Sequence, residues 1–183
     1  MANLKDSCKF STHDDYYTPK SAWEQVSHLI PENIVIWEAC CLNSHKSQSP
    51  EYLQELNPTT TVVADRTMNC LTQKPENFDM IITNPPFSNK KKDGYLKSKV
   101  LTRLHDLDKP FMIIMNSMNT FTKYLRTIFK GDMKYLQIIT PQRKIQFNKL
   151  LKSGELVPTK KCSFYCIYLC YKMDLPTESL WLN

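Results

Sequence analysis

The apolar residues of the chain gather in short segments that predict the strands of a sheet. Five such segments are rich in β-branched residues and are bounded by Pro, Asn or Asp: 33–39, 59–65, 78–83, 110–115 and 135–140. Within each of them, apolar residues follow one another without alternating with polar ones. This pattern is typical of parallel strands that are covered by helices on both faces.

The segments between these strands have the pattern of amphipathic helices. Four helices are predicted, at residues 19–30, 49–56, 94–107 and 119–129. The first has Pro19 just inside its start, with Thr18 before it as the N-cap. Alternation of strands and helices along a chain indicates a doubly wound α/β sheet.

The C-terminal part of the chain departs from this alternation. Residues 161–173 form a long, aromatic-rich β run, which we expect to pair antiparallel with residues 135–140. Residues 142–161 are the longest polar stretch and are predicted to be a loop, the most mobile one of the chain. Because the sequence has no repeat and no second region of distinct composition, residues 1–183 are predicted to form one domain.

The composition is that of a globular protein and argues against several other classes. Of the 183 residues, 42% are hydrophobic and 23% are charged. No apolar run approaches the roughly 20 residues that a membrane helix needs. The N-terminus has no apolar signal-peptide core. We therefore expect a protein that is intracellular, and neither secreted nor bound to a membrane.

The cysteines and histidines lack the spacing of a metal site. None of the seven cysteines forms a C-x2-C pair, and the four histidines are scattered, so we do not expect zinc. We expect the thiols to be reduced. Cys40 and Cys41 are predicted to be small packing residues rather than reactive groups.

A rigid polar turn follows the strand predicted at 78–83. Ligands bind beyond the carboxyl ends of the strands in a doubly wound sheet, and Asn84, Pro85, Pro86 and Phe87 occupy that place. The Asn84 side-chain oxygen and the Pro85 backbone oxygen are suited to accept both hydrogens of an exocyclic amine such as that of adenine. The prolines would hold these acceptors stiffly, and Phe87 offers a flat face for stacking the base.

Basic residues follow this turn. Lys90, Lys91 and Lys92 suit phosphate groups, and a net charge of +6 fits a polyanionic partner. The same features also have a purely structural interpretation. Asn-Pro-Pro ends a strand efficiently, an aromatic residue can cap a core, and lysine runs are common in solvated loops.

Several motifs, in order, resemble those of the DNA adenine-N6 methyltransferases, of the compact kind common in phages and large DNA viruses. "NPPF" at 84–87 is similar to the catalytic motif of that family, and "FDMIIT" before it is similar to the strand that carries the motif. The resemblance covers most of the chain. The other matching segments are "DDYYTP" (14–19), "VIWEACCLNS" (35–44), "VVADR" (62–66), "NCLT" (69–72) and "RKIQF" (143–147), the last followed by the β run to Met173.

The resemblance implies a Rossmann-like fold with a mostly parallel seven-stranded sheet and a C-terminal antiparallel hairpin. It implies S-adenosyl-L-methionine as cofactor and adenine N6 in DNA as methyl acceptor; a viral member would act in the cytoplasm or nucleus of its host. The catalytic residues that it implies are Asn84, Pro85, Pro86 and Phe87. The residues that it assigns to the cofactor are Tyr17, Thr18, Glu38, Ala39, Cys40, Asp65, Asn69, Cys70 and Asn84. The nucleic-acid contacts that we predict are Lys90, Lys91, Lys92, Arg143 and Lys144.

The motifs that the resemblance assigns to the cofactor depart from the family pattern. The family has a glycine-rich turn after its first strand, because the backbone approaches the ligand closely there. This chain has three glycines, and none of them lies between residues 1 and 93. Ala39, Leu42 and Ser44 stand where a proline and two glycines are expected, and Asn69 replaces an acid that meets the cofactor's adenine.

The residues leave two other functions open. A methyltransferase-like protein without catalysis would bind nucleic acid or a partner subunit through the same face; the missing glycines favour it and the intact N-P-P-F opposes it. A catalytic protein could instead act on RNA adenine or on a protein glutamine. The lysines and the net charge favour nucleic acid, DNA rather than RNA. The chain leaves little room for a target-recognition segment beyond the loop at 142–161, so we expect sequence specificity that is slight or that a second chain supplies, in a homodimer or with a partner subunit.

Overall fold

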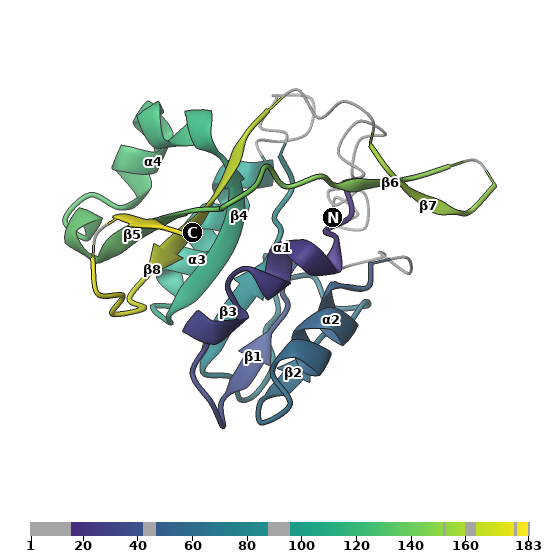
Figure 1. Cartoon of the computed structure of the whole chain (residues 1–183). Helices are drawn as coiled ribbons and strands as arrows, with labels where there is room; N and C mark the ends of the chain where they lie inside the picture. Colours follow the sequence, from purple (N-terminus) through teal and green to yellow (C-terminus); the bar gives the residue numbers. More distant parts are fainter. Residues whose placement is uncertain are drawn as a thin grey trace, which may run out of the picture.

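Seven strands form one sheet in the order β2-β1-β3-β4-β8-β5-β9 (Figure 1). The fold is that of a computed structural model, which describes residues 16–41, 47–87, 96–151, 153–159, 164–177 and 179–182. Strand β8 runs antiparallel to its neighbours β4 and β5, and every other neighbouring pair is parallel. The strands are β1 (Val35–Trp37), β2 (Thr61–Val63), β3 (Met80–Thr83), β4 (Phe111–Asn116), β5 (Leu136–Thr140), β8 (Cys166–Tyr171) and β9 (Ser179–Trp181).

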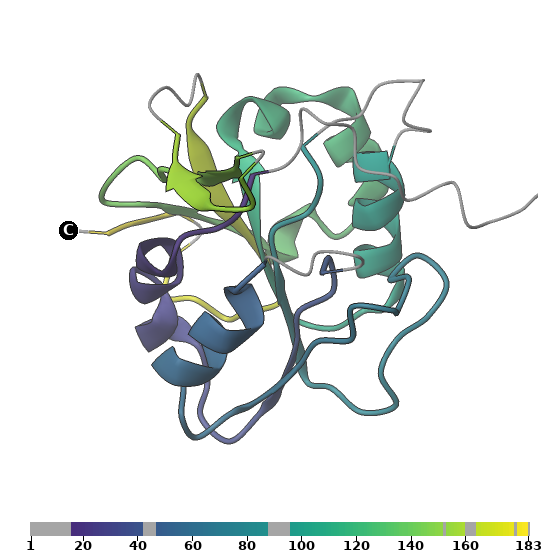
Figure 2. The ribbon, with the colours of Figure 1, turned by 90° about the vertical axis from the view of Figure 1, so that its right-hand side faces the viewer.

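Helices cover both faces of this sheet, as Figure 2 shows. The α-helices are α1 (Lys20–Glu24), α2 (Ser49–Leu56), α3 (Leu96–Asp106) and α4 (Lys123–Ile128), and the 3-10 helices are η2 (Ser27–Leu29), η4 (Ser117–Phe121) and η5 (Met133–Tyr135). Trp23 of α1 and Leu53 of α2 pack in one core cluster with Ile82 of β3. Leu101 of α3 packs on the opposite face with Ile81, because successive side chains of a strand point to opposite faces.

The structure confirms the α/β class and the strands predicted from apolar segments. It also confirms that the aromatic-rich run pairs antiparallel with β5, with Leu169 of β8 opposite Ile138. Helix α2 has the predicted bounds. The four buried residues of β3 show why that segment lacks alternation: its side chains are covered on both faces.

Two of the predicted helices are shorter than expected. Residues 19–30 contain only five residues of α-helix, followed by the 3-10 helix η2. The prediction for the start of this helix was wrong, because Pro19 itself is the N-cap and Thr18 makes no capping hydrogen bond. Residues 119–129 are interrupted at Thr122, whose extended backbone separates η4 from α4.

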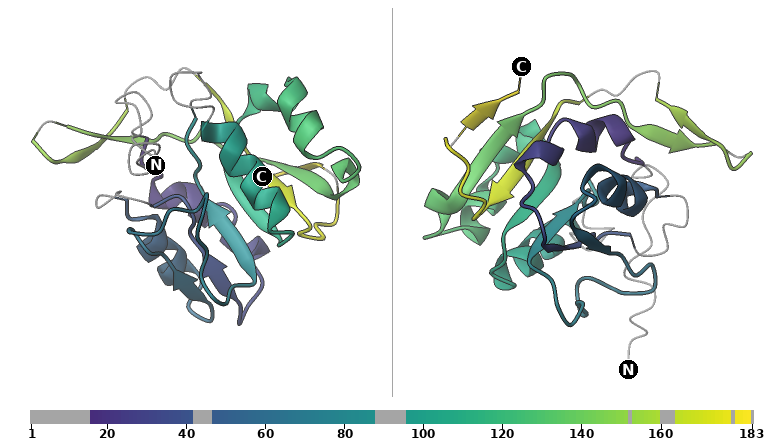
Figure 3. Two further views of the ribbon diagram at one scale, coloured as in Figure 1. Left: turned by 180° about the vertical axis from the view of Figure 1, so that it is seen from behind. Right: turned by 60° about the horizontal axis from the view of Figure 1, so that its bottom comes forward.

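The expectation of a plain loop at 142–161 was also wrong. Ile145 and Phe147 are buried in the core, and strands β6 (Asn148–Leu150) and β7 (Leu156–Pro158) pair antiparallel. This hairpin projects from the body of the molecule (Figure 3). Strand β9, which pairs with β5 at the sheet edge, is a further element that the apolar pattern did not predict. Among the described residues, no helix is long and apolar enough to cross a membrane.

Candidate active site

Three segments of the chain meet at the carboxyl edge of the parallel strands. They are the turn after β1, the turn after β3 and the segment that precedes α1. The Asn84 Nδ2 group donates to the backbone oxygen of Tyr16 at 3.2 Å, and the backbone N–H of Cys40 donates to Thr83 Oγ1 at 3.0 Å. These bonds bring together residues that lie far apart in the sequence, at the edge where α/β folds bind ligands.

The orientation of the Asn84 amide is fixed by the backbone. A carbonyl oxygen can only accept, so the Asn84 atom that faces the Tyr16 oxygen is the nitrogen. The Asn84 Oδ1 atom is buried and has no hydrogen-bond partner among the described residues. A buried polar atom without a partner is costly, and this one is an acceptor held in a fixed direction next to the buried Pro85 and Pro86.

Phe87 belongs to an interlocked group of four aromatic rings, which we call the aromatic cluster: Tyr16, Phe87, Phe147 and Phe164. The Phe87 ring lies 5.1 Å from that of Phe164 and 5.5 Å from that of Phe147, measured between centroids. Phe147 is fully buried, whereas Phe87 is half-buried. The contacts of the cluster hold the Phe87 ring in place, while Phe87 itself stays only half-buried.

Glu38 is a buried carboxyl group at the end of β1. Its Oε1 atom accepts a hydrogen bond from the Thr83 hydroxyl at 2.5 Å, and its Oε2 atom is buried with no partner among the described residues. Burial raises the pKa of the Glu38 carboxyl, and the hydrogen bond from Thr83 opposes that rise. Glu38 Oε2 is therefore, within the described part of the chain, a second acceptor atom without a partner at this edge.

The segment before α1 contributes a third buried polar group. The Thr18 hydroxyl is buried with no partner among the described residues. The position of this segment is set by Tyr17, whose backbone exchanges two 2.9 Å hydrogen bonds with Asn148 of β6. The hairpin thus anchors the N-terminal part of the site.

The turns after β1 and β2 bring two of the predicted cofactor residues into contact. The thiols of Cys40 and Cys70 interact electrostatically, and both cysteines are free of disulfides. The neighbouring Cys70 thiol and, after it, burial raise the pKa of the Cys40 thiol. A protonated Cys40 next to the buried Ala39 agrees with a packing role.

Asp65 and Asn69 both follow β2 in the chain, and their side chains bond within their own turns. Asp65 is exposed and accepts from the backbone N–H of Thr67 at 2.8 Å and from its hydroxyl at 2.6 Å. These bonds lower the pKa of Asp65. The Asn69 side-chain oxygen accepts from the backbone N–H of Leu71 at 3.1 Å. Each carboxylate or amide oxygen still has acceptor capacity for a ligand.

The predicted nucleic-acid contacts are only partly described. Lys90, Lys91 and Lys92 lie outside the described residues, as do Leu42 and Ser44 of the turn after β1. Arg143 and Lys144 are exposed on the segment that leads into the hairpin. The Lys144 Nζ atom lies 4.5 Å from the centroid of the Tyr165 ring.

Sequence reasoning missed a buried lysine that holds the turn after β3. Lys97 of α3 is 7% exposed, and its Nζ atom donates to the backbone oxygen of Phe87 and to Asn119 Oδ1, both at 2.9 Å. Tyr124 donates to the same Asn119 oxygen. No sequence signal distinguishes Lys97 from its exposed neighbours. Thr83 was also missed, although a threonine that ends a buried strand is a detectable signal.

We expect Lys97→Met to slow catalysis and to lower stability. The methionine keeps most of the apolar stem but loses both hydrogen bonds, which costs about 1–3 kcal/mol of unfolding free energy. The turn at Phe87 would then be less ordered, so kcat should fall about ten-fold, while cofactor affinity is unchanged. Urea unfolding and single-turnover kinetics check this, with the exposed Lys99→Met as control. If Lys97→Met had the same kcat as wild type, the turn at Phe87 would not depend on the Lys97 hydrogen bonds.

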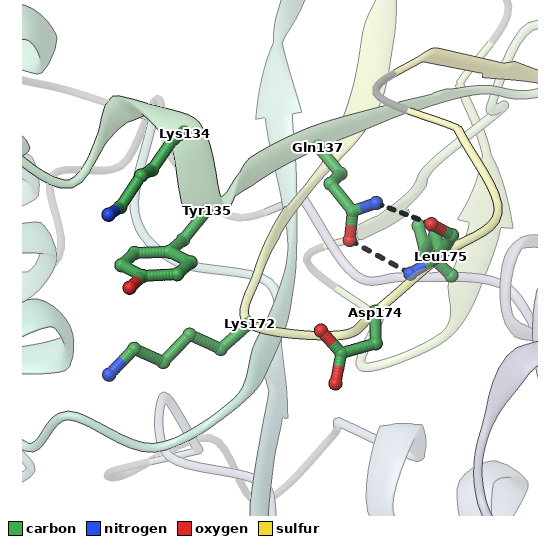
Figure 4. A pocket seen from close by; sticks show the side chains of 6 residues that line it. All are labelled: Lys134, Tyr135, Gln137, Lys172, Asp174 and Leu175. Carbon is green, nitrogen blue, oxygen red and sulfur yellow. Dashed lines mark hydrogen bonds between the residues drawn. The ribbon is translucent and has the colours of Figure 1, made fainter.

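A hollow at the opposite edge of the sheet has a structural explanation. It has a volume of about 270 Å³ and lies near the start of β5 and the end of β8, away from Asn84. Figure 4 shows that Gln137 crosses it to bond the backbone of Leu175, accepting at 3.0 Å and donating at 2.9 Å. Gln137 therefore closes the loop after β8.

Comparisons with known proteins agree with this geometry. No protein-family model and no curated protein matches the sequence. A Listeria monocytogenes protein described as a class I S-adenosylmethionine-dependent methyltransferase matches in structure with a TM-score of 0.53 and 13% identity, over 97% of this chain and 68% of that chain. A Pyrococcus horikoshii protein described as an RNA methyltransferase matches with a TM-score of 0.52 and 15% identity, over 93% of each chain. At these identities the likeness concerns the fold, which is that of the class I methyltransferases.

Proposed function

We propose that the protein transfers a methyl group from S-adenosyl-L-methionine to the N6 amino group of adenine in nucleic acid, with DNA as the expected substrate. One observation carries the proposal. The side-chain oxygen of Asn84 is buried, lacks a partner among the described residues and is fixed in direction by the Tyr16 carbonyl. Such an acceptor suits an amine that must be oriented for attack.

The other buried acceptors fit the proposed cofactor. When bound, S-adenosyl-L-methionine supplies a methyl group on a positively charged sulfur. Glu38 would hold the ammonium group of its methionine part through Oε2, which lacks a partner among the described residues. The Thr18 hydroxyl would bond the same part of the cofactor, and the turns that contain Cys40, Asp65 and Cys70 would hold its adenosine.

The proposed reaction needs positioning rather than a covalent enzyme intermediate. The cofactor would supply the methyl group by direct displacement, in which adenine N6 takes the methyl carbon and the electron pair of the broken carbon–sulfur bond stays on sulfur. One N6 proton then passes to solvent. Asn84 Oδ1 and the Pro85 backbone oxygen would accept from the two N6 hydrogens, and the accessible part of Phe87 would contact the base.

A non-catalytic methyltransferase-like subunit is the second candidate, and the turn after β1 favours it. Ala39 is 3% exposed and Cys41 is 2% exposed, and the sequence has no glycine in this turn. The two positions at which glycines are expected hold Leu42 and Ser44, and a side chain there takes space that a glycine would leave to a ligand. Such a subunit would bind nucleic acid or a partner chain through the same edge.

Calorimetric titration with S-adenosyl-L-methionine and with S-adenosylhomocysteine separates the two candidates. The proposed function requires saturable binding, which we expect in the micromolar range, followed by transfer of labelled methyl groups to DNA. The Thr18→Val variant, which keeps the shape of the side chain, should bind more weakly than wild type. A folded protein that neither binds the cofactor nor is stabilised by it against heat would favour the non-catalytic subunit.

A further inference from the structure

The three most exposed large apolar side chains of the described residues lie at the same edge as Asn84. They are Met118 (68% exposed), Phe121 (76%) and Tyr165 (65%). Met118 and Phe121 belong to η4, which follows β4, and Tyr165 directly precedes β8. The backbone N–H of Ser117 donates to the Tyr165 oxygen at 2.9 Å, so the two segments are joined. We call these three residues the outer platform.

Both halves of the outer platform are tied to residues that contact Phe87. Phe164 belongs to the aromatic cluster and lies 5.1 Å from Phe87 between centroids, and Tyr165 is the next residue of the chain. Asn119 lies between Met118 and Phe121 in the sequence. Its Oδ1 atom accepts a hydrogen bond from Lys97, which also donates to the backbone oxygen of Phe87. The outer platform is therefore an outward continuation of the proposed adenine site.

The backbone under the outer platform is held rigidly. Asn116 Oδ1 accepts from the Met118 N–H at 3.0 Å, and Thr120 and Thr122 donate their hydroxyls to backbone oxygens of η4 at 2.7 and 2.6 Å. The exposure of Phe121 is thus set by a well-bonded turn. Large apolar side chains displayed in this way mark a binding surface.

Charge indicates what this surface binds. Three exposed cations, Lys123, Arg143 and Lys144, belong to the segments next to the outer platform. Lys144 lies over the Tyr165 ring, and Lys123 is exposed two residues after Phe121. Aromatic side chains interleaved with cations are the arrangement on which single-stranded nucleic acid binds, with bases stacked on the rings and phosphates near the lysines.

We propose that the outer platform stacks unpaired bases that flank the target adenine, so that the preferred substrate is nucleic acid with an unpaired segment. This inference rests on the proposed function for the identity of the target base. Bases in an intact duplex are stacked on one another and present no face to Phe121 or Tyr165. Single strands, and duplexes opened at the target, present such faces.

The test is fluorescence anisotropy with the full chain and labelled oligonucleotides that contain one adenine. DNA and RNA of the same sequence are used single-stranded and as duplexes. Wild type should bind the single strands more tightly than the duplexes. The Phe121→Ala/Tyr165→Ala variant should bind the single strands about ten-fold to a hundred-fold more weakly. The matched control, Met133→Ala/Tyr135→Ala, removes an exposed apolar pair at the opposite edge and should bind like wild type.

The outcomes separate this inference from the proposed function. Single-strand binding that is lost in the platform variant supports the outer platform even if wild type transfers no methyl group, in which case only the proposed function fails. Unchanged binding and unchanged methyl transfer in the platform variant overturn the outer platform and leave the proposed function intact. Tighter binding of wild type to duplexes than to single strands overturns the outer platform too. So does a platform variant that still binds the oligonucleotides but no longer forms a dimer that wild type forms in sedimentation, because the surface would then be a dimer contact. Comparison of the affinities for DNA and for RNA of the same sequence shows which nucleic acid the protein prefers.

Discussion

The Asn84→Ala variant is expected to transfer methyl groups at least about a hundred-fold more slowly than wild type. The substitution removes the Oδ1 acceptor that would orient the adenine amine, and alanine offers no replacement. It also removes the hydrogen bond to the Tyr16 carbonyl, which we expect to cost about 1 kcal/mol of unfolding free energy. Initial rates with labelled S-adenosyl-L-methionine, together with thermal unfolding, check both parts.

Two further variants separate orientation from stability. In Asn84→Asp one acceptor oxygen is kept, but a second oxygen faces the Tyr16 carbonyl, so the side chain is turned away and activity should also be lost. Asn57 is a buried asparagine that bonds the backbone oxygen of Leu53 at the end of α2. Asn57→Ala should therefore lower the melting temperature and leave the rate per folded molecule unchanged. Full turnover in Asn84→Ala would contradict the proposed role of this residue.

The Glu38→Gln variant is expected to be more stable than wild type at neutral pH and to bind S-adenosyl-L-methionine at least about ten-fold more weakly. Glutamine can still accept the Thr83 hydroxyl through Oε1 but carries no charge to bury. It also cannot offer a carboxylate to the ammonium group of the cofactor. A gain in stability with a loss of ligand is expected where a buried charge serves binding rather than folding.

The pH dependence of this gain has a definite sign. Burial raises the pKa of Glu38 in the folded state, so the native protein binds this proton more tightly than the unfolded chain does. The contribution of Glu38 to the unfolding free energy is therefore fully present below the ordinary carboxyl pKa. It is lost as pH rises through the raised pKa of Glu38 in the folded state. The stability difference between Glu38→Gln and wild type should therefore be small near pH 4 and grow as pH rises.

Urea unfolding across this pH range measures the difference. The exposed Glu51, which pairs with Arg66 at 2.8 Å, provides the control. Glu51→Gln should show no gain at high pH, because its carboxyl group is not buried. A Glu38→Gln variant that is less stable than wild type at every pH would indicate that the carboxylate contributes to folding.

The sheet could be predicted from sequence because its signals are local. Residues 78–83 are apolar without alternation, and the structure buries all of β3. Asn84 could be placed at the carboxyl edge because the turn directly follows that strand. Residues 49–56 have Pro50 in the first turn and an apolar face that packs on the sheet, and helix α2 has the bounds predicted from them.

The missed features depend on contacts between distant residues. Lys97 contacts Phe87 and Asn119 across elements that meet only in the fold. The hairpin β6–β7 could not be predicted because each of its strands has only three residues, too few for a periodic pattern, and the pairing of Asn148 with Tyr17 helps to hold it. The direction of the Asn84 amide depends on Tyr16, which is 68 positions away in sequence. Periodicity and composition carry no information on such pairs.

Nucleoside analysis of the methylated product tests the central claim most directly. The wild-type protein and Asn84→Ala would be incubated with labelled S-adenosyl-L-methionine and an oligonucleotide that contains one adenine. The strand would then be digested to nucleosides and separated. The account predicts that the label co-elutes with N6-methyladenine nucleoside for wild type only. Label on another base, or equal label from wild type and Asn84→Ala, would contradict it.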